Sequence, residues 1–370
     1  MKAYVLHGAG DLRYETVADP VPGKKEVLVA VKHVGICGSD LPRIYQTGAH
    51  VHPLVPGHEF AGTVVDVGDE AGKGWLGKRV GVFPMIPCRA CAPCLEGHYE
   101  LCRSYGYLGS RRDGGFAEFV AVPEENLLLL PDDVSLQEAA MLEPMSVAVH
   151  AMRRGLPEWA FPPGENTGRG QADVRGEAAG REKTIVVCGL GTIGMFLLMF
   201  LKEAGYENVF ALGNKEFQRE KAALLGVPDQ DYCDVKTTDA GRWLSRRTEG
   251  RGTNVSFECV GKNETVSLAV ECAAPEGRIV LVGNPASDMA FKRDIYWKIL
   301  RNQLTVTGTW NSSFNHEAAD DWHYVLERLG GKRIDPAAMI SHRLPLAFLE
   351  RGLHIMRDKT EDYGKIMADI

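Results

Sequence analysis

Short apolar runs rich in β-branched residues dominate the first part of the chain. They occur at 26–35, 61–68, 78–84 and 116–122, and Gly and Pro separate them. Runs of this length, bounded by turn-forming residues, predict β-strands. We therefore expect residues 1–150 to form a β-rich domain, and residues 309–370, which have a similar mixed texture, to fold back onto it.

Between these parts, strand-like and helix-like runs alternate. The strand-like runs lie at 184–189, 209–213, 255–261, 278–283 and 304–308, and the helix-like runs at 193–205, 216–226 and 264–274. This alternation predicts an α/β domain over residues 151–308, with a doubly wound parallel sheet and helices on both faces. The segment 162–183 is rich in glycine and charge, so we expect it to be a flexible surface insertion.

One uncharged stretch, "TIVVCGLGTIGMFLLMFL" at 184–201, is close to the length of a membrane-spanning helix. However, its β-branched start and the glycines Gly189, Gly191 and Gly194 favour a buried strand, a turn and a buried helix. The first residues, "MKAYVLHGAGDLRYE", contain no apolar segment of the secretory kind. We therefore expect a cytoplasmic protein whose thiols stay reduced.

Composition narrows the range of partners. The apolar fraction of 45% is ordinary for a globular protein, and the net charge of −7 with a pI of about 5.9 favours neither nucleic acid nor an anionic membrane. We expect a small-molecule ligand instead.

Four of the nine cysteines, Cys88, Cys91, Cys94 and Cys102, share one short loop. Disulfides are disfavoured in a chain of this kind with an odd number of cysteines. An iron–sulfur cluster is an alternative, but the ferredoxin run ends with a three-residue spacing and Cys-Pro, whereas here seven residues precede Cys102-Arg103. Four thiolates around one tetrahedral Zn²⁺ fit best, and such a closed site is structural.

A second set of metal-binding side chains is scattered over the chain. "GICGSD" contains Cys37, Ser39 and Asp40, "PGHEFAG" contains His58 and Glu59, and "MLEPM" contains Glu143. Each is a weak signal alone, because a single Cys or Glu is more often structural. Together they supply the Cys, His and carboxylate of an open, catalytic zinc site.

The glycines of "VVCGLGTIGMF" stand between the predicted strand and helix, and with Thr192 and Ile193 they form a dinucleotide-binding fingerprint. An acidic residue should end the next strand and bind the ribose 2′-hydroxyl. That strand ends instead in Gly213-Asn214-Lys215. Lys215 and Arg219 could pair with a 2′-phosphate, which slightly favours tolerance of NADP(H). Alternatively they are surface charges, and NAD(H) binds through the backbone.

"GHEFAG", the four-cysteine loop and "CGLGTIG" together resemble the zinc-dependent medium-chain alcohol and polyol dehydrogenases. The resemblance implies a GroES-like catalytic domain, a Rossmann domain, two zinc ions per chain, a nicotinamide cofactor and a homodimer or homotetramer. It also implies that Cys37, His58 and either Glu59 or Glu143 bind the catalytic zinc. Asp40 would orient His58, and Ser39 would take the alcohol proton. Pro42 stands three residues beyond Ser39, so a relay through a histidine there is excluded.

Within that family, "CGSDLPRI", "GAH" and "SRRDGGFAE" resemble the galactitol-1-phosphate 5-dehydrogenase branch. Arginine suits phosphate oxygens, so Arg43 and the pair Arg111 and Arg112 are candidates for binding a sugar-alcohol phosphate. His50 and Asn311 are weaker candidates for hydroxyl contacts. The alternatives are a dehydrogenase of a free polyol of the sorbitol or xylitol type, of threonine or of a simple alcohol, and an inactive dinucleotide-binding structural protein.

Overall fold

The computed structural model describes residues 1–157 and 182–370, and most of the predicted insertion at 162–183 lies outside them. The chain forms two compact units. One contains Met1–Ser146 and Ser313–Ile370, and the other contains Val147–Ser312. The boundary after Ser146 falls inside helix α4 (Leu142–Gly155).

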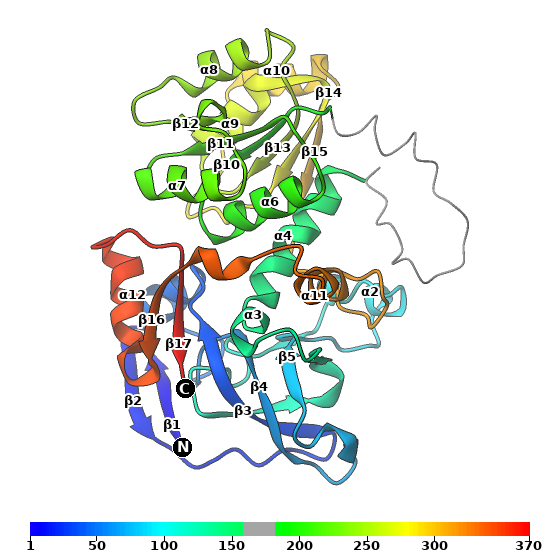
Figure 1. Ribbon diagram of the computed structural model, residues 1–370, viewed down its shortest axis with the longest axis vertical. Coiled ribbons are helices and arrows are strands. Elements are labelled where there is room, and N and C mark those ends of the chain that lie inside the picture. Colours follow the sequence, from blue (N-terminus) through cyan, green and yellow to red (C-terminus); the bar gives the residue numbers. More distant parts are fainter. Residues whose placement is uncertain (158–181) are drawn as a thin grey trace. The chain divides into compact units, whose positions relative to one another are not determined.

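The first unit is built on a mostly antiparallel sheet of seven strands (Figure 1). Its order is β16 (Ile340–Pro345), β17 (Lys365–Asp369), β3 (Glu26–Gly35), β4 (Glu59–Val67), β5 (Arg79–Val82) and β9 (Leu127–Leu129), with β8 (Phe119–Pro123) also paired to β3. Two small sheets pair β1 (Lys2–Gly8) with β2 (Asp11–Thr16) and β6 (Met85–Ile86) with β7 (Gly106–Tyr107). The helices are α1 (Asp40–Pro42), α2 (Ala92–Leu95), α3 (Leu136–Ala139), α11 (Asp321–Gly330) and α12 (Leu349–Asp358).

Alternation along β3 explains the core of this unit. Val27, Val29 and Val31 are buried, whereas the residues between them are partly exposed, as expected for a sheet with one face against the core. The last strand, β17, pairs antiparallel with the end of β3, through Met367 and Gly35.

The second unit is a parallel six-stranded sheet. Its order is β12 (Tyr232–Asp234), β11 (Val209–Gly213), β10 (Ile185–Cys188), β13 (Thr253–Glu258), β14 (Ala273–Leu281) and β15 (Thr305–Gly308). The helices are α6 (Thr192–Glu203), α7 (Glu216–Leu224), α8 (Ala240–Arg247), α9 (Asn263–Cys272) and α10 (Arg293–Arg301). Helices α6 and α7 lie on one face of the sheet and α8, α9 and α10 on the other (Figure 1).

Together these units confirm the predicted α/β class, with a β-rich unit and a doubly wound parallel sheet. The uncharged stretch at 184–201 forms β10, a turn and most of α6, and both elements are largely buried in the second unit. No helix among the described residues is long and apolar enough to cross a membrane.

Candidate metal centres and dinucleotide site

The four cysteines of the loop converge. Cys91 precedes α2, Cys94 lies within it, and Cys88 and Cys102 flank the loop on either side. The Sγ atom of Cys91 lies 3.5 Å from that of Cys94 and 4.0 Å from that of Cys102. Tetrahedral zinc with Zn–S bonds of about 2.3 Å places sulfur atoms roughly 3.8 Å apart. The separations therefore fit a Cys₄ zinc site, and they are too long for a disulfide.

The environment of these thiols is uneven. Hydrogen bonds from the backbone of Arg103 and Cys94 lower the pKa of Cys91 to about 6, whereas burial raises the pKa of Cys94 to about 12. The loop thus presents both ready thiolates and thiols that ionise only when a metal replaces the proton.

A second cluster gathers Cys37, His58 and Glu59, whose donor atoms all lie within 4.8 Å of one another. Cys37 follows the end of β3, and Glu59 opens β4, which pairs with β3 through Gly35 and Glu59. His58 and Glu59 are buried. A thiol, an imidazole and a carboxylate at this spacing form the donor set of a three-ligand zinc site, as the sequence indicated.

The Asp40 side chain contacts both Cys37 and His58 of this cluster. It is fully buried, and its Oδ2 accepts a hydrogen bond of 3.0 Å from the backbone N–H of Cys37. Its Oδ1 lies 3.4 Å from Nδ1 of His58 and accepts a bond of 2.7 Å from Nη1 of Arg43. Although burial opposes it, the charge of Asp40 raises the pKa of His58 well above its usual value. The Ser39 hydroxyl lies 3.3 Å from Sγ of Cys37, beside the donor set.

Glu143, at the start of α4, approaches the same cluster. The Tyr107 hydroxyl donates to its Oε1 at 3.3 Å, and the Tyr107 ring packs edge-on against His58 at 5.8 Å. Burial raises the pKa of Glu143 to about 7, although the charge of His58 opposes the shift. Sequence reasoning missed Tyr107, because a tyrosine in a short strand carries no signal of its own.

Lys365 of β17 was also missed. It forms a buried ion pair with Glu59, and its Nζ donates to the backbone oxygen of Ile36 at 3.0 Å. Glu59 therefore faces both a cation and the Cys37–His58 pair.

The predicted substrate residues have different surroundings. Arg43 lies at the cluster, with 18% of its side chain exposed. Arg111 stacks on Tyr105 at 4.8 Å, and His50 is exposed on a loop. Asn311, in the other unit, accepts a bond from the backbone N–H of Ser312.

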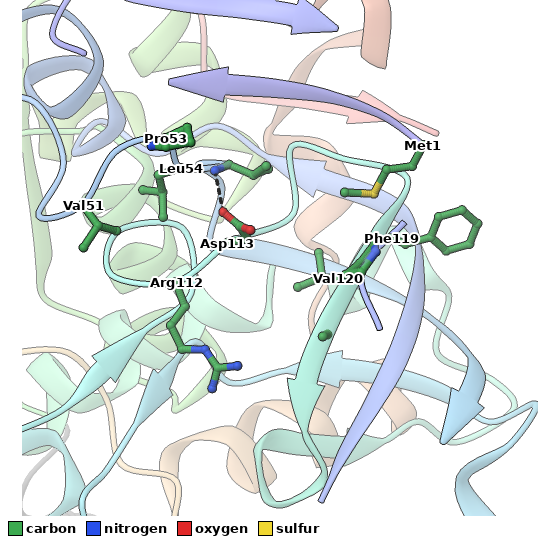
Figure 2. Close-up of a pocket in the computed structure, with 12 residues that line it drawn as sticks. Met1, Val51, Pro53, Leu54, Arg112, Asp113, Phe119 and Val120 are labelled. Atoms are coloured by element: carbon green, nitrogen blue, oxygen red, sulfur yellow. Dashed lines mark hydrogen bonds between the residues drawn. The ribbon is translucent and has the colours of Figure 1, made fainter. Parts of the chain in front are cut away.

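Arg112 lines a separate cavity of about 320 Å³ with Met1, Val51 and Phe119 (Figure 2). Its guanidinium pairs with Glu26 at 2.5 Å. The metal-binding residues Cys37, His58 and Glu59 do not line this cavity.

The glycine fingerprint forms the turn between β10 and α6. Gly189 has φ of +95°, and a Cβ atom there would lie 2.5 Å from Val260 Cγ2, so both conformation and space require glycine. Gly191, Thr192 and Ile193 form the N-terminal end of α6, where backbone N–H groups can bind a pyrophosphate. A Cβ atom at Gly194 would lie 2.0 Å from the Gly189 oxygen, so only glycine allows the helix to pack this closely on the turn.

The tip of β11 holds the other predicted cofactor residues. Asn214 is exposed after Gly213, and Lys215 precedes α7. The guanidinium of Arg219 lies 3.2 Å from Asp229 and stacks on the Tyr232 ring at 5.2 Å. Arg219 is therefore already engaged by a carboxylate.

Comparisons with known proteins agree with this geometry. Residues 23–132 match the alcohol dehydrogenase GroES-like domain family, and residues 192–330 match the zinc-binding dehydrogenase family. Galactitol 1-phosphate 5-dehydrogenase of Escherichia coli strain K12 is 32% identical over 346 residues, which cover 93% of this chain and 92% of that protein. Sorbitol dehydrogenase of Halalkalibacterium halodurans is 27% identical over 365 residues, 96% of each.

Solved structures give the same result. The crystal structure of galactitol-1-phosphate dehydrogenase from Escherichia coli covers all of both chains with a TM-score of 0.86 and 30% identity. The Cys₄ and Cys–His–Glu clusters are both present here, which argues against an inactive structural protein. The chain therefore belongs to the zinc-binding medium-chain dehydrogenase family, as an NAD(P)-dependent alcohol or polyol dehydrogenase.

Proposed function

We propose that the enzyme oxidises a secondary alcohol of a sugar-alcohol phosphate of the galactitol 1-phosphate kind. The observation that carries this proposal is the position of Arg43. Its guanidinium donates to Asp40, and the same carboxylate contacts His58. Asp40 therefore links a cation to the metal-binding histidine. Part of the side chain is exposed, and a guanidinium has more donors than one carboxylate oxygen uses. A phosphate oxygen is a suitable second acceptor.

In this proposal, Cys37 and His58 hold the catalytic zinc with Glu59 or Glu143. When bound, Zn²⁺ supplies a Lewis acid that makes an alcohol group more acidic. Asp40 fixes the orientation of His58 through Nδ1 and fixes the loop through the N–H of Cys37. The Ser39 hydroxyl, beside Cys37, accepts the alcohol proton and passes it to solvent.

A bound nicotinamide cofactor would supply the hydride acceptor. The glycine turn and the N-terminal end of α6 would hold its pyrophosphate. The tip of β11 has Gly213, Asn214 and Lys215 where an acid would select NAD(H), so we expect NADP(H) to be accepted as well. Lys215 and Arg219 are the two candidate cations for a 2′-phosphate, and Arg219 also pairs with Asp229.

A free polyol of the sorbitol type is the second candidate. It is favoured by the engagement of Arg43 with Asp40, which gives this arginine a structural partner without any phosphate. Initial rates of the wild-type enzyme on galactitol 1-phosphate, galactitol, sorbitol and threonine, each with NAD and NADP, distinguish the candidates. Equal efficiency on galactitol 1-phosphate and galactitol would exclude the phosphate proposal.

The assembly is a homodimer in this proposal, formed by the second unit. Strand β15 ends the parallel sheet, and among the described residues it pairs only with β14. Large exposed apolar side chains lie before it, in it and just after it along the chain: Met289, Phe291, Tyr296, Trp297, Leu300, Val306 and Trp310. An unpaired edge flanked by apolar side chains is self-complementary, because a twofold axis can pair it with the same strand of a second copy.

A further inference from the structure

The glycine at the tip of β11 is required by space rather than by backbone conformation. Gly213 is buried, and its φ lies outside the left-handed region that favours glycine. A Cβ atom added there would lie 2.4 Å from the hydroxyl oxygen of Tyr232 and 2.9 Å from its Cζ. Side-chain atoms at such distances overlap, so any larger residue requires Tyr232 to move.

Tyr232 is held in place. It belongs to β12, which pairs in parallel register with β11 through Ala211 and Tyr232. Its hydroxyl donates to the backbone oxygen of Lys215 at 2.9 Å, and the guanidinium of Arg219 covers its ring. The residue is 5% exposed. A rigid ring fixed by a strand, a hydrogen bond and a stacked cation cannot yield as a flexible side chain would.

Gln218 also lies against Gly213, and it connects Gly213 to the glycine turn that is expected to bind phosphate. Its Oε1 would lie 2.9 Å from a Cβ atom at Gly213. That oxygen accepts from the backbone N–H of Asn214 at 2.9 Å, and its Nε2 donates to the backbone oxygen of Leu190 at 2.9 Å. A displacement at Gly213 is therefore transmitted to the glycine turn.

We propose that Gly213 and Tyr232 together determine the specificity for the dinucleotide, because Tyr232 occupies the volume that the side chain of a strand-ending acid at position 213 needs. This proposal rests on the proposed function in one respect: the tip of β11 faces the adenosine ribose. With Tyr232 in place the last residue of β11 carries no carboxylate that would repel a 2′-phosphate or accept from a 2′-hydroxyl. An acid at position 213 therefore requires changes at both Gly213 and Tyr232. Changing Gly213 alone does not make the site prefer NAD(H).

The experiment compares the wild type with Gly213→Asp, Tyr232→Leu and the double variant. Dissociation constants of NADH and NADPH are measured from dihydronicotinamide fluorescence, and thermal unfolding is recorded for each protein. Gly213→Asp alone should lower the unfolding temperature and weaken both nucleotides to a similar extent, because Gln218 passes the displacement to Leu190. Tyr232→Leu alone should leave the ratio of the two constants unchanged.

The double variant should recover stability relative to Gly213→Asp and shift the ratio toward NADH by about tenfold to a hundredfold, the range of one charged hydrogen bond. Tyr206→Leu is the matched control, because Tyr206 is also buried but lies before β11, away from its tip. Its effect should simply add to that of Gly213→Asp. If Gly213→Asp proves too unstable to purify, Gly213→Ala tests the same conflict by unfolding temperature, with and without Tyr232→Leu.

Two results would overturn the inference. One is a shift of the nucleotide ratio by Gly213→Asp alone that equals the shift in the double variant. The other is a stably folded double variant that keeps the wild-type ratio. A wild type that binds NADH far more tightly than NADPH would refute the proposed NADP(H) tolerance. The inference about Gly213 and Tyr232 would still be decided by comparing Gly213→Asp with the double variant.

Discussion

Glu59 and Lys365 form an ion pair in which each side chain is only 1% exposed, although 306 residues separate them in sequence. The pair joins the first residue of β4 to the first residue of β17. It also places a cation next to a carboxylate of the Cys37–His58–Glu59 cluster. The metal-binding end of the unit thus depends on the last strand of the chain.

Lys365→Met should destabilise the protein strongly. The substitution leaves the Glu59 carboxylate buried without its cation, and breaking one partner of a buried pair costs about 3–5 kcal/mol. Denaturant unfolding measures the loss. Lys24→Met is the matched control, because Lys24 pairs with Glu70 on the surface, where such a pair contributes at most about 1 kcal/mol. Equal losses in the two variants would contradict a structural role for the buried pair.

The two metal clusters should be separable by mutation. Wild-type protein should contain two zinc ions per chain by elemental analysis. Cys91→Ser should lose one ion and lower the unfolding temperature, because structural zinc contributes directly to folding. Cys37→Ser should lose the other ion and all turnover, while the unfolding temperature changes much less. One metal per chain in the wild type, or iron with visible absorbance, would refute the assignment.

Zinc binding to the four-cysteine loop should weaken as pH falls. The pKa of Cys94 is about 12 because the thiol is buried, so in the metal-free protein this thiol is protonated at neutral pH. Zinc requires the thiolate and displaces the proton, so the apparent dissociation constant should rise at least about tenfold for each unit of decrease in pH. Titration with a chromophoric chelator in Cys37→Ser protein, which retains only the loop site, measures this slope. A dissociation constant independent of pH would contradict it.

Arg43→Ala should distinguish phosphorylated from free polyols. Losing a charged hydrogen bond of about 1.5–3 kcal/mol should reduce kcat/KM on galactitol 1-phosphate by roughly tenfold to a hundredfold more than on galactitol. Any loss common to both substrates reports the broken contact with Asp40. Arg13→Ala is the control, because Arg13 pairs with Asp11 on the surface and belongs to no predicted site. Equal losses on both substrates in Arg43→Ala would mean that this arginine only supports Asp40.

Val306→Lys should disrupt the proposed homodimer. Val306 is exposed in the edge strand β15, and a lysine there places a charge against its own copy across the twofold axis. Light scattering after size-exclusion chromatography should show a shift from dimer to monomer. Val65→Lys, an exposed valine of β4 in the other unit, should leave the mass unchanged. A wild type that is monomeric at micromolar concentration would refute the interface.

The sequence by itself determined the features that depend on neighbouring residues. The four-cysteine loop lies within one short segment, so its spacing alone indicated a tetrahedral metal site. The alternation of apolar runs predicted the parallel sheet, because each strand and its helix must bury apolar faces locally. The strand, glycine turn and helix at 184–201 were predictable for the same reason.

Only the tertiary structure decided which distant side chains meet. Lys365 reaches Glu59, Tyr107 reaches Glu143, and Tyr232 fills the space beside Gly213. None of these contacts leaves a pattern in the sequence, because each depends on how two separate elements pair or pack. The sequence showed that β11 ends in Gly213 rather than in an acid. In our proposal the physical reason is steric, because a Cβ atom at Gly213 would overlap the hydroxyl of Tyr232.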